Sequence, residues 1–455
     1  MASLQAKITG AILSMIRKRR TASEVAESNS YIRSSASRVI APAKVREVQF
    51  SDFDAVAELK QRWGIAADSL ENWERLWHRN PALGSAVQRQ TNRPMGWVLE
   101  ADGAVVGYLG NISLQCRYGD RTLTAVAAHG LVVEPSYRAV SLTLTAAFFR
   151  QKSVDLCLCT TAIEAVGKMA MAFKSTPLPQ PDYHSVLFWV LQPYPFARAL
   201  MTKLNLGPAT ERVGSVVAAL AVGTDKILRR RWPRRSATSL TISEIAPNDM
   251  GDAFQVLWAE KLKEKLKERP RLLADRSLAT LRWHFEIPGD LGCARVLCCR
   301  KDGELVGYAV VRTDTDPENG LRKSVMADTL VRHDDPEIVK ALWAAAYESA
   351  KHAGSHVLEV MGFPPSIRGV CSEWNPYQRK YPASPYYYKA ADPALHEELS
   401  KAEAWYATPF DGDGTLIRPS YASSAPPDAP GLQMKDGREN NIAPHVPEEE
   451  RTEVC

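Results

Sequence analysis

Hydrophobic residues recur along this chain with two periods, near two in some stretches and near 3.6 in others, which predict strands and helices respectively. From residue 44 the two patterns follow one another closely and predict an α/β unit. The expected strands are 45–50, 97–100, 104–112, a pair around 118–120, 125–133, 153–161 and 185–191, and the expected helices are 51–63, 68–80, one beginning at 137, and 162–173.

The same order returns about two hundred positions later. The segment EADGAVVGYLG at 100–110 reappears as RKDGELVGYAV at 300–310, and both copies carry an Asp-Gly pair that suits a tight hairpin. A repeat this long implies two domains of one fold rather than a solenoid. The second copy is expected to have strands at 241–245, 324–331, 356–361 and 386–388, and helices from 249 and at 336–353.

The pattern divides the chain into five parts. Residues 1–20 have apolar residues on one side and five basic residues, and 229–235 contain five arginines. Both segments could touch an anionic membrane, although a solvated arm and a solvated linker explain them equally. The parts are a basic amphipathic arm and linker (1–43), an N-terminal domain (44–193), a helical basic linker (194–238), a C-terminal domain (239–418) and a disordered tail (419–455).

Composition narrows the classes of function. The net charge of +5 over 455 residues gives no case for a dedicated nucleic-acid binder, so we expect no DNA partner. The eight cysteines lack zinc-type spacing, and most lie in apolar runs typical of buried thiols, so we expect no metal and a reducing cytoplasm. No apolar run reaches the roughly 18 residues of a membrane span, which leaves peripheral contact with the inner membrane as the alternative location. The sequence does not define the oligomeric state.

The stretch 125–151 carries the first candidate for chemistry. A strand ends at Glu134-Pro135-Ser136 and a helix follows at once. Such a turn leaves backbone N–H groups unpaired at the positive end of the helix dipole, which favours a phosphate group. An ordinary connection between strand and helix is the alternative. The second copy has Asp334 and Asp335 at this place, which suit helix capping and oppose a phosphate.

This order of elements, with the entry Val-x-Pro-x-Tyr-Arg into the central helix, resembles the GNAT acyltransferase superfamily. The loop of that family reads R/Q-x-x-G-x-G/A, and its amides hold the pyrophosphate of an acyl-coenzyme A. Arg138 matches the pattern, whereas Ser141 and Thr143 stand at the two glycine positions. The tandem layout is also similar to Fem-type peptidyltransferases and to acyltransferases of surface-polysaccharide synthesis. The resemblance implies acetyl-CoA or another acyl-CoA as co-substrate, bound by Val133, Arg138, Ala139, Val140, Ser141, Leu142 and Thr143.

The resemblance also implies roles for four other residues. His129, nine positions before Arg138, stands where the family places a general base, although a buried histidine with a structural role is the alternative. Tyr183 is the nearest candidate for the general acid, although a buried tyrosine more often serves in packing. Thr160 and Thr161, at the end of a central strand, are expected to bind substrate or to cap the next helix.

Three functions are compatible with these patterns. The first is a tandem GNAT-like N-acyltransferase, acting on a small amine or a sugar amine in surface-polysaccharide or cell-envelope synthesis. The second is a catalytically inactive scaffold of an envelope or polysaccharide assembly. The third is a Fem-type transfer from charged transfer RNA, which predicts salt-sensitive RNA binding.

Overall fold

The computed structural model describes residues 41–416, except for 66, 89–92, 205–207, 234–238, 265–269 and 288–292. The predicted amphipathic arm at 1–20 and the tail from 419 lie outside these residues. Within the described ranges, every helix is too short or too polar to cross a membrane.

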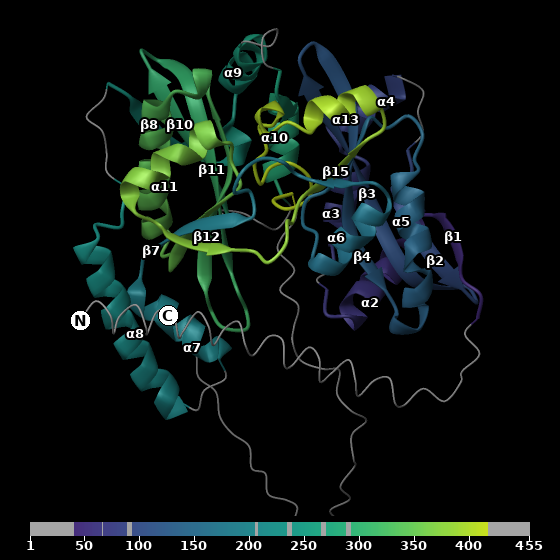
Figure 1. Cartoon of the computed structure of the whole chain (residues 1–455), viewed down its shortest axis with the longest axis horizontal. Coiled ribbons are helices and arrows are strands. Elements are labelled where there is room, and N and C mark those ends of the chain that lie inside the picture. The colour runs from purple at the N-terminus through teal and green to yellow at the C-terminus, as the bar shows by residue number, and fades with distance from the viewer. Residues whose placement is uncertain are drawn as a thin grey trace, which may run out of the picture.

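Two mixed sheets with helices against them form the two halves of the molecule (Figure 1). The predicted α/β class is therefore confirmed. In the first sheet the strands follow the order β1-β2-β3-β4-β5-β15-β6, and β9 pairs with β3. The strands are β1 (Lys44–Glu47), β2 (Gly96–Ala101), β3 (Ala104–Tyr118), β4 (Arg121–Val133), β5 (Leu156–Cys159), β15 (Tyr387–Ala390), β6 (Thr176–Pro177) and β9 (Leu272–Ala274).

The second sheet has a corresponding order, β8-β10-β11-β12-β13-β7-β14. In each sheet a hairpin leads to one parallel pair, β4–β5 in the first and β12–β13 in the second. The strands are β8 (Thr241–Ile245), β10 (Ala294–Lys301), β11 (Glu304–Thr315), β12 (Arg322–Val331), β13 (Val357–Met361), β7 (Ser185–Val190) and β14 (Tyr377–Lys380).

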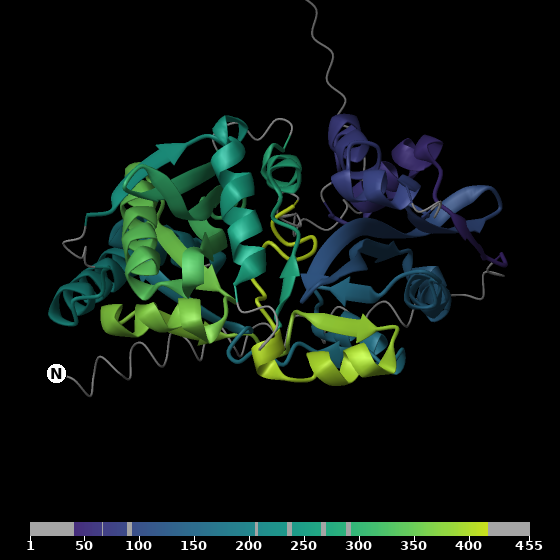
Figure 2. The ribbon, with the colours of Figure 1, turned by 90° about the horizontal axis from the view of Figure 1, so that it is seen from above.

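Each half takes one strand from the distant part of the chain. Strand β7 pairs with β13 in the second sheet, and β15 pairs with β5 in the first. The sequence predicted each of these as the closing strand of its own copy, and both assignments are corrected here. The alternation of a strand identifies its faces but not its hydrogen-bonding neighbour, because that neighbour is chosen by packing across the whole molecule. Figure 2 shows β15 and α13 beside the first half from above.

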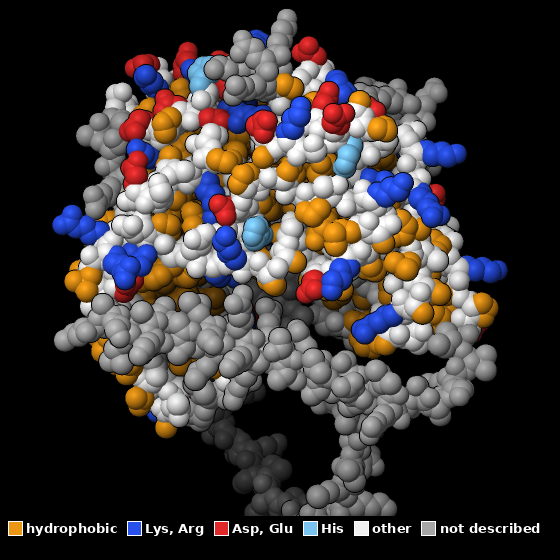
Figure 3. All heavy atoms as spheres, in the orientation of Figure 1, with side chains coloured by type: hydrophobic (Ala, Val, Ile, Leu, Met, Phe, Trp, Pro, Cys, Tyr) orange, Lys and Arg blue, Asp and Glu red, His pale blue; other side chains and the backbone are white. Residues whose placement is uncertain are grey.

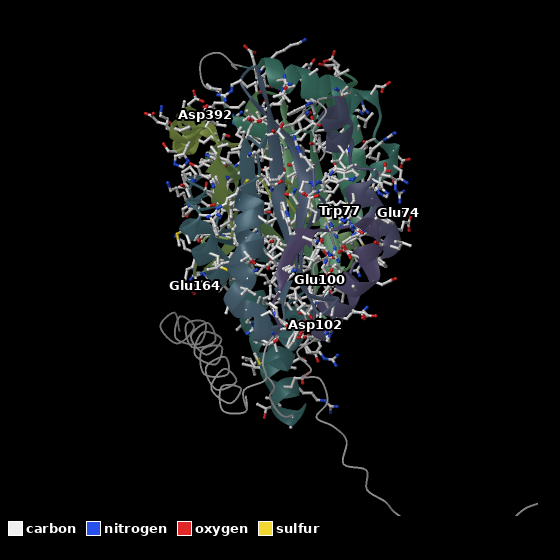
Figure 4. All side chains as sticks on the ribbon, turned by 90° about the vertical axis from the view of Figure 1, so that its right-hand side faces the viewer. Glu74, Trp77, Glu100, Asp102, Glu164 and Asp392 are labelled. Carbon is white, nitrogen blue, oxygen red and sulfur yellow. The ribbon has the colours of Figure 1, made fainter. Side chains whose placement is uncertain are left out.

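Helices cover both faces of the first sheet. Trp73 and Leu76 pack on one face, whereas Leu144 and Phe148 pack on the other. In Figure 4, which looks onto this half, Asp392 before α13 lies on the same side as Glu164 of α6. The helices of this half are α2 (Phe53–Arg62), α3 (Leu70–Trp77), α4 (Pro81–Gln88), α5 (Ser141–Phe149), α6 (Glu164–Ala172) and α13 (Pro393–Leu399).

The second half has one large core around β10–β13. Six cysteines are buried in the two halves, as predicted: Cys116, Cys157, Cys159, Cys298, Cys299 and Cys371. The helices of this half are α7 (Pro193–Lys203), α8 (Pro208–Leu228), α9 (Asp252–Lys263), α10 (Leu278–Phe285), α11 (Pro336–His352) and α12 (Pro365–Arg368).

Both predicted Asp-Gly hairpins are confirmed. They join β2 to β3 and β10 to β11. Asp102 and Asp302 have φ values of 48° and 51°, and Gly103 and Gly303 follow them with positive φ. These are the conformations that a two-residue hairpin turn requires.

Residues 407–416, called the C-terminal segment below, lie between the two halves (Figures 1 and 2, yellow). The segment is tied to both halves by backbone carbonyls. Arg75 of α3 donates to the Leu416 carbonyl, and Arg312 of β11 donates to the Thr415 carbonyl, each at 2.6 Å. The two halves also contact each other directly, because Arg75 Nη1 donates to the Trp283 carbonyl and Trp283 Nε1 donates to the Arg75 carbonyl.

Candidate functional site

The centre of the first sheet contains a fork between two parallel strands. Ala125, Val126 and Ala127 of β4 are the residues paired with Leu156–Leu158 of β5. Beyond Ala127 the two strands are no longer paired. His129 lies just past this point on β4, and Thr160 follows the last residue of β5. The structure therefore brings the predicted base and the predicted substrate residues to the same fork.

His129 is buried between two carboxylates. Its Nε2 lies 3.6 Å from Asp68 Oδ2, and its Nδ1 lies 3.5 Å from Asp413 Oδ2. These contacts are longer than a good hydrogen bond. Neither ring nitrogen has another hydrogen-bond partner among the described residues, and the nearby Tyr108 hydroxyl has none either. Buried polar atoms that lack partners are uncommon, and they often mark a functional site.

Lys60 holds the Asp68 carboxylate in place. The Lys60 ammonium donates to Asp68 Oδ2 at 2.7 Å, and the Asn72 amide donates to Asp68 Oδ1 at 2.8 Å. Lys60 reaches this position beside Gly130, where a Cβ would lie 3.2 Å from the Lys60 ammonium. Gly130 also has φ of +64°, which a larger residue adopts only with strain.

The charges around His129 shift the pKa values of the cluster. Burial and the Lys60 charge favour the neutral imidazole, but the facing Asp413 and Asp68 carboxylates outweigh them and raise the pKa of His129 above its ordinary value. Burial alone would raise the pKa of Asp68, but His129 and Lys60 outweigh it and lower that pKa far below the usual range. Asp68 therefore stays ionised and can stabilise an imidazolium.

Asp413 of the C-terminal segment fills the fork. Its Oδ1 accepts hydrogen bonds from Thr160 at 2.9 Å and from Thr161 at 3.1 Å. Gly412, with φ of +87°, precedes it and packs directly against the Thr160 side chain. Thr160 and Thr161 were predicted to bind substrate or to cap a helix. In this structure the acceptor of both hydroxyls is a carboxylate of the chain itself.

The fork of the second sheet is chemically different. Asp328 of β12 accepts two hydrogen bonds from Arg276, and both side chains are fully buried. Tyr308 and Thr408 also donate to this carboxylate, each at 2.9 Å. The second fork therefore holds a saturated ion pair, whereas the first holds a histidine without good hydrogen bonds.

Asp411, also in the C-terminal segment, lies beside this second fork. Its Oδ1 is 3.6 Å from the Arg276 guanidinium and has no hydrogen bond of its own. Burial raises the pKa of Asp411 to about 7, although Arg276 and the Thr408 amide oppose the shift.

Tyr183, the predicted general acid, contacts the C-terminal segment at Thr408. Its ring packs on Tyr386, and its hydroxyl donates to the Thr408 carbonyl at 3.3 Å. Burial and the nearby Asp411 raise the pKa of Tyr183 well above its ordinary value, so the phenol stays protonated. In the described part of the chain, Tyr183 and His129 share no direct hydrogen bond or ring contact.

The predicted phosphate loop has a compact form. A 3-10 helix runs from Pro135 to Val140 and continues into α5. Its hydrogen bonds use the amide of Tyr137, which donates to the Glu134 carbonyl, and the amide of Ser141, which donates to the Arg138 carbonyl. The expectation of open amides is therefore corrected for Tyr137 and Ser141. The physical reason is that without glycine the chain coils into a regular turn instead of leaving its amides outward.

Some side chains of the loop donate hydrogen bonds to loop carbonyls, and most are exposed to solvent. Ser141 donates its hydroxyl to the Arg138 carbonyl, and Thr143 donates to the Val140 carbonyl. Arg138, Ala139, Val140, Leu142 and Thr143 are exposed, and Val133 is half-buried at the end of β4. In the described part of the chain the Arg138 guanidinium has no ion-pair partner. It is therefore available to an anion.

The corresponding turn of the second copy is closed by acids, as predicted. Asp335 is the N-cap of α11 and accepts a hydrogen bond from the Glu337 amide. The Asp334 carboxylate accepts from Lys261 and Arg271 at 2.6 and 2.7 Å. Burial opposes ionisation, but these two cations lower the pKa of Asp334 to about 2.

Sequence reasoning missed three residues of the His129 cluster. Lys60 carried a signal, because it lies four residues after Val56 and therefore on the buried face of its helix. Asp68 precedes the Ser69 N-cap of α3, and nothing local links it to β4. Asp413 is hundreds of positions from His129, and only the three-dimensional fold brings the two together.

Two small pockets adjoin the C-terminal segment. The described residues line two small pockets between the halves, and both include Gly412. One pocket is bounded by Asn80, Asp275 and His284, and the other by Cys116 and Asp411. In the described ranges, no three His, Cys, Asp or Glu residues are grouped to hold a metal ion.

Comparisons with known proteins give structural similarity without sequence similarity. No family model matches the sequence, and no curated protein matches it. A GCN5-related N-acetyltransferase from Kribbella flavida shares 10% identity at a TM-score of 0.44, over 78% of this chain and 73% of that chain. Another from Anabaena variabilis shares 8% identity at a TM-score of 0.46, over 77% and 73%. At these values the similarity carries no argument about activity.

Proposed function

We propose that this protein is an N-acyltransferase that moves an acyl group from an acyl-CoA to an amine at the fork between β4 and β5. The observation that carries the proposal is His129, buried between Asp68 and Asp413 without a good hydrogen bond. A histidine held between carboxylates can accept a proton and keep the resulting charge, which is what a general base must do. The proposed acceptor class is a small amine or an amino sugar of an envelope polysaccharide.

The reaction requires proton transfers and the exchange of a C–S bond for a C–N bond. His129 accepts a proton from the substrate ammonium, and the resulting amine attacks the thioester carbonyl. The new C–N bond forms as the C–S bond breaks, the attacking nitrogen gives up a second proton to become the neutral amide, and the leaving thiolate takes up a proton. We assign this last donation to Tyr183, whose raised pKa keeps it protonated. Tyr183 donates a hydrogen bond to the C-terminal segment, and Asp413 is part of that segment. A shift of the segment would therefore release the Tyr183 hydroxyl and open the fork at the same time.

The co-substrate would bind along the loop from Val133 to Thr143. Arg138 is the group best suited to its phosphates, since it is exposed and lies in the 3-10 turn that leads into α5. The 3-10 turn must loosen before the Ser141 amide can contribute, because that amide is already hydrogen-bonded.

The test is an assay of coenzyme A thiol release from acetyl-CoA with a panel of amines and amino sugars. Release is expected with at least one acceptor, and His129→Gln should lower kcat by about 100-fold while acetyl-CoA binding is retained. A His129→Gln enzyme with wild-type kcat would overturn the assignment of the base.

A second candidate is a scaffold that keeps the fold without the chemistry. Two observations favour it: Asp413 occupies the fork, and the loop amides of Tyr137 and Ser141 are hydrogen-bonded internally. The two candidates predict different results when variants are returned to a strain that lacks the gene. If His129→Gln restores the wild-type phenotype as fully as the unaltered gene, the scaffold is supported, and if it fails to restore it while the protein is folded, the enzyme is supported.

A further inference from the structure

Helix α8 carries an exposed apolar stripe along its whole length. Its members recur at intervals of three and four residues, so they lie on one face of the helix. The exposed fractions are large, from 48% at Val216 to 73% at Leu228. Figure 3 shows apolar side chains at the lower left, where Figure 1 places α8. The stripe consists of Val213, Val216, Val217, Leu220, Ile227 and Leu228.

The opposite face of α8 is already used for packing. A Cβ on Gly214 would lie 3.2 Å from the Met201 sulfur of α7, and one on Gly223 would lie 3.9 Å from Pro193. Lys226 donates to the Leu191 carbonyl of the second half. Since these contacts fix the orientation of α8, the apolar stripe cannot turn inward.

The charges around the stripe are positive. Residues 193–231 contain seven Lys and Arg and two acidic residues. Both acids are ion-paired: Glu211 lies 3.8 Å from Arg198, and Asp225 lies 2.8 Å from Arg229 and 2.7 Å from Arg231. Both acids of this stretch are thus paired, and the stripe ends in three consecutive arginines. Exposed Tyr194 begins α7 next to this end, where its ring could lie at a lipid–water boundary.

We propose that the exposed face of α8 lies on an anionic membrane surface. An apolar stripe about 120° wide with basic residues at its border is the pattern of an interfacial helix. The apolar side chains would enter the acyl boundary, while Arg212 and Arg230 would contact lipid phosphates. The inference does not depend on the proposed acyl transfer, because neither His129 nor Arg138 takes part.

The test uses the full chain and lipid vesicles. Wild-type protein should co-sediment with phosphatidylcholine vesicles that contain about a third phosphatidylglycerol, and it should bind pure phosphatidylcholine far more weakly. Val217→Glu with Leu220→Glu should lower the partition coefficient at least about tenfold, because two charges would enter the apolar layer. Arg212→Glu with Arg230→Glu should weaken only the binding to anionic vesicles. Val256→Glu, an equally exposed apolar position on α9, is the matched control and should bind as wild type does.

Two results would overturn the proposal. One is wild-type protein that stays in the supernatant with anionic vesicles at low salt, or a Val217→Glu, Leu220→Glu variant that binds as tightly as wild type. The other is concentration-dependent self-association in sedimentation velocity that Leu220→Glu abolishes, without any vesicle binding. The second result would assign the stripe to a contact between two copies of the chain.

Discussion

The proton on His129 is controlled by two carboxylates that come from different parts of the chain. Asp68 belongs to the first half and is itself held by Lys60, whereas Asp413 arrives from the C-terminal segment. One carboxylate is therefore held within the first half, and the other is held by the C-terminal segment. If the segment moves, the imidazole loses one of the two groups that favour its charged form.

Asp413→Asn should lower the pKa of His129. The amide keeps the shape and one acceptor oxygen for Thr160, but it removes a negative charge 3.5 Å from the ring. The loss of this charge should bring the pKa of His129 down, as measured by NMR titration of the imidazole. Asp411→Asn is the matched control, because it changes the same segment without touching His129.

The same variant has a predicted pH signature in stability. The folded-state pKa of His129 is raised, so its contribution is fully present below the unfolded value of about 6.5 and is lost as the pH rises through the folded value. Asp413→Asn should therefore lose more stability at pH 5 than at pH 8, measured by denaturant unfolding. An equal loss at both pH values would contradict the charge interaction.

At this scale the sequence predicted single residues better than their partners. His129, Thr160 and Thr161 were chosen on separate grounds, and the structure places all three around one carboxylate. Asp413 was visible in the sequence only as part of a polar end. Its role depends on the C-terminal segment returning to the first half. Local sequence pattern does not encode that path, because Asp413 and Thr160 lie far apart in the sequence.

At the scale of elements, the conformation of the loop before α5 depends on its particular side chains. Ser141 and Thr143 close the turn with their hydroxyls, as glycine could not. Ser141→Gly with Thr143→Gly should loosen the 3-10 turn and strengthen acetyl-CoA binding by roughly fivefold, measured by calorimetry. Each glycine should also cost roughly 0.3–0.5 kcal/mol of helix stability, because serine and threonine are themselves weaker helix formers than alanine.

Ala147→Gly provides the control for this loop prediction. It places a glycine in the same helix, outside the loop, and should lower stability without improving binding. If the double glycine variant binds acetyl-CoA no better than Ala147→Gly does, the loop is not a phosphate site that only needs opening.

The position of β15 in the first sheet gives a second prediction for an element. A Cβ on Gly167 of α6 would lie 2.5 to 2.7 Å from the Tyr387 ring of β15. Gly167→Ala should therefore destabilise the protein by about 2 kcal/mol, although alanine is the better helix former. The free energy of unfolding is measured in urea. Replacing the ring by a smaller side chain with Tyr387→Leu should restore part of the stability that Gly167→Ala loses.

Gly84→Ala is the matched control, because Gly84 is also helical and has nothing within 4 Å of its Cβ position. It should be neutral or slightly stabilising. Equal stabilities of Gly167→Ala and Gly84→Ala would show that β15 does not lie against α6.

Element identity was largely predictable, and element pairing was not. The Asp102-Gly103 and Asp302-Gly303 turns fix their hairpins within a few residues, so those pairs followed from local chemistry. The helix expected at 68–80 ends at Trp77, and Pro81 begins a further helix, α4, since proline suits the first turn. The apolar runs at β7 and β15 identified strands, but the choice between the two sheets depends on the packing of both halves.

At the scale of the whole molecule, the exchanged strands join the two halves into one structure. Removing either half would leave the other without a strand beside its fork, because β7 and β15 cross between them. The C-terminal segment adds buried hydrogen bonds to both halves.

We therefore expect a single unfolding transition. Calorimetric and van't Hoff enthalpies should agree, and fluorescence and circular dichroism should give the same midpoint in urea. Two resolved transitions would contradict the view that the exchanged strands couple the halves.

The most direct test of the central claim is calorimetric titration of the full chain with acetyl-CoA. The account predicts a binding heat that Arg138→Glu weakens by about tenfold, because the guanidinium is replaced by a charge that repels phosphate. Arg150→Glu, the same change at the other end of α5, should bind as wild type does. Absence of both heat and thermal stabilisation with the wild-type protein, or equal affinity in Arg138→Glu, would contradict acyl transfer at this fork.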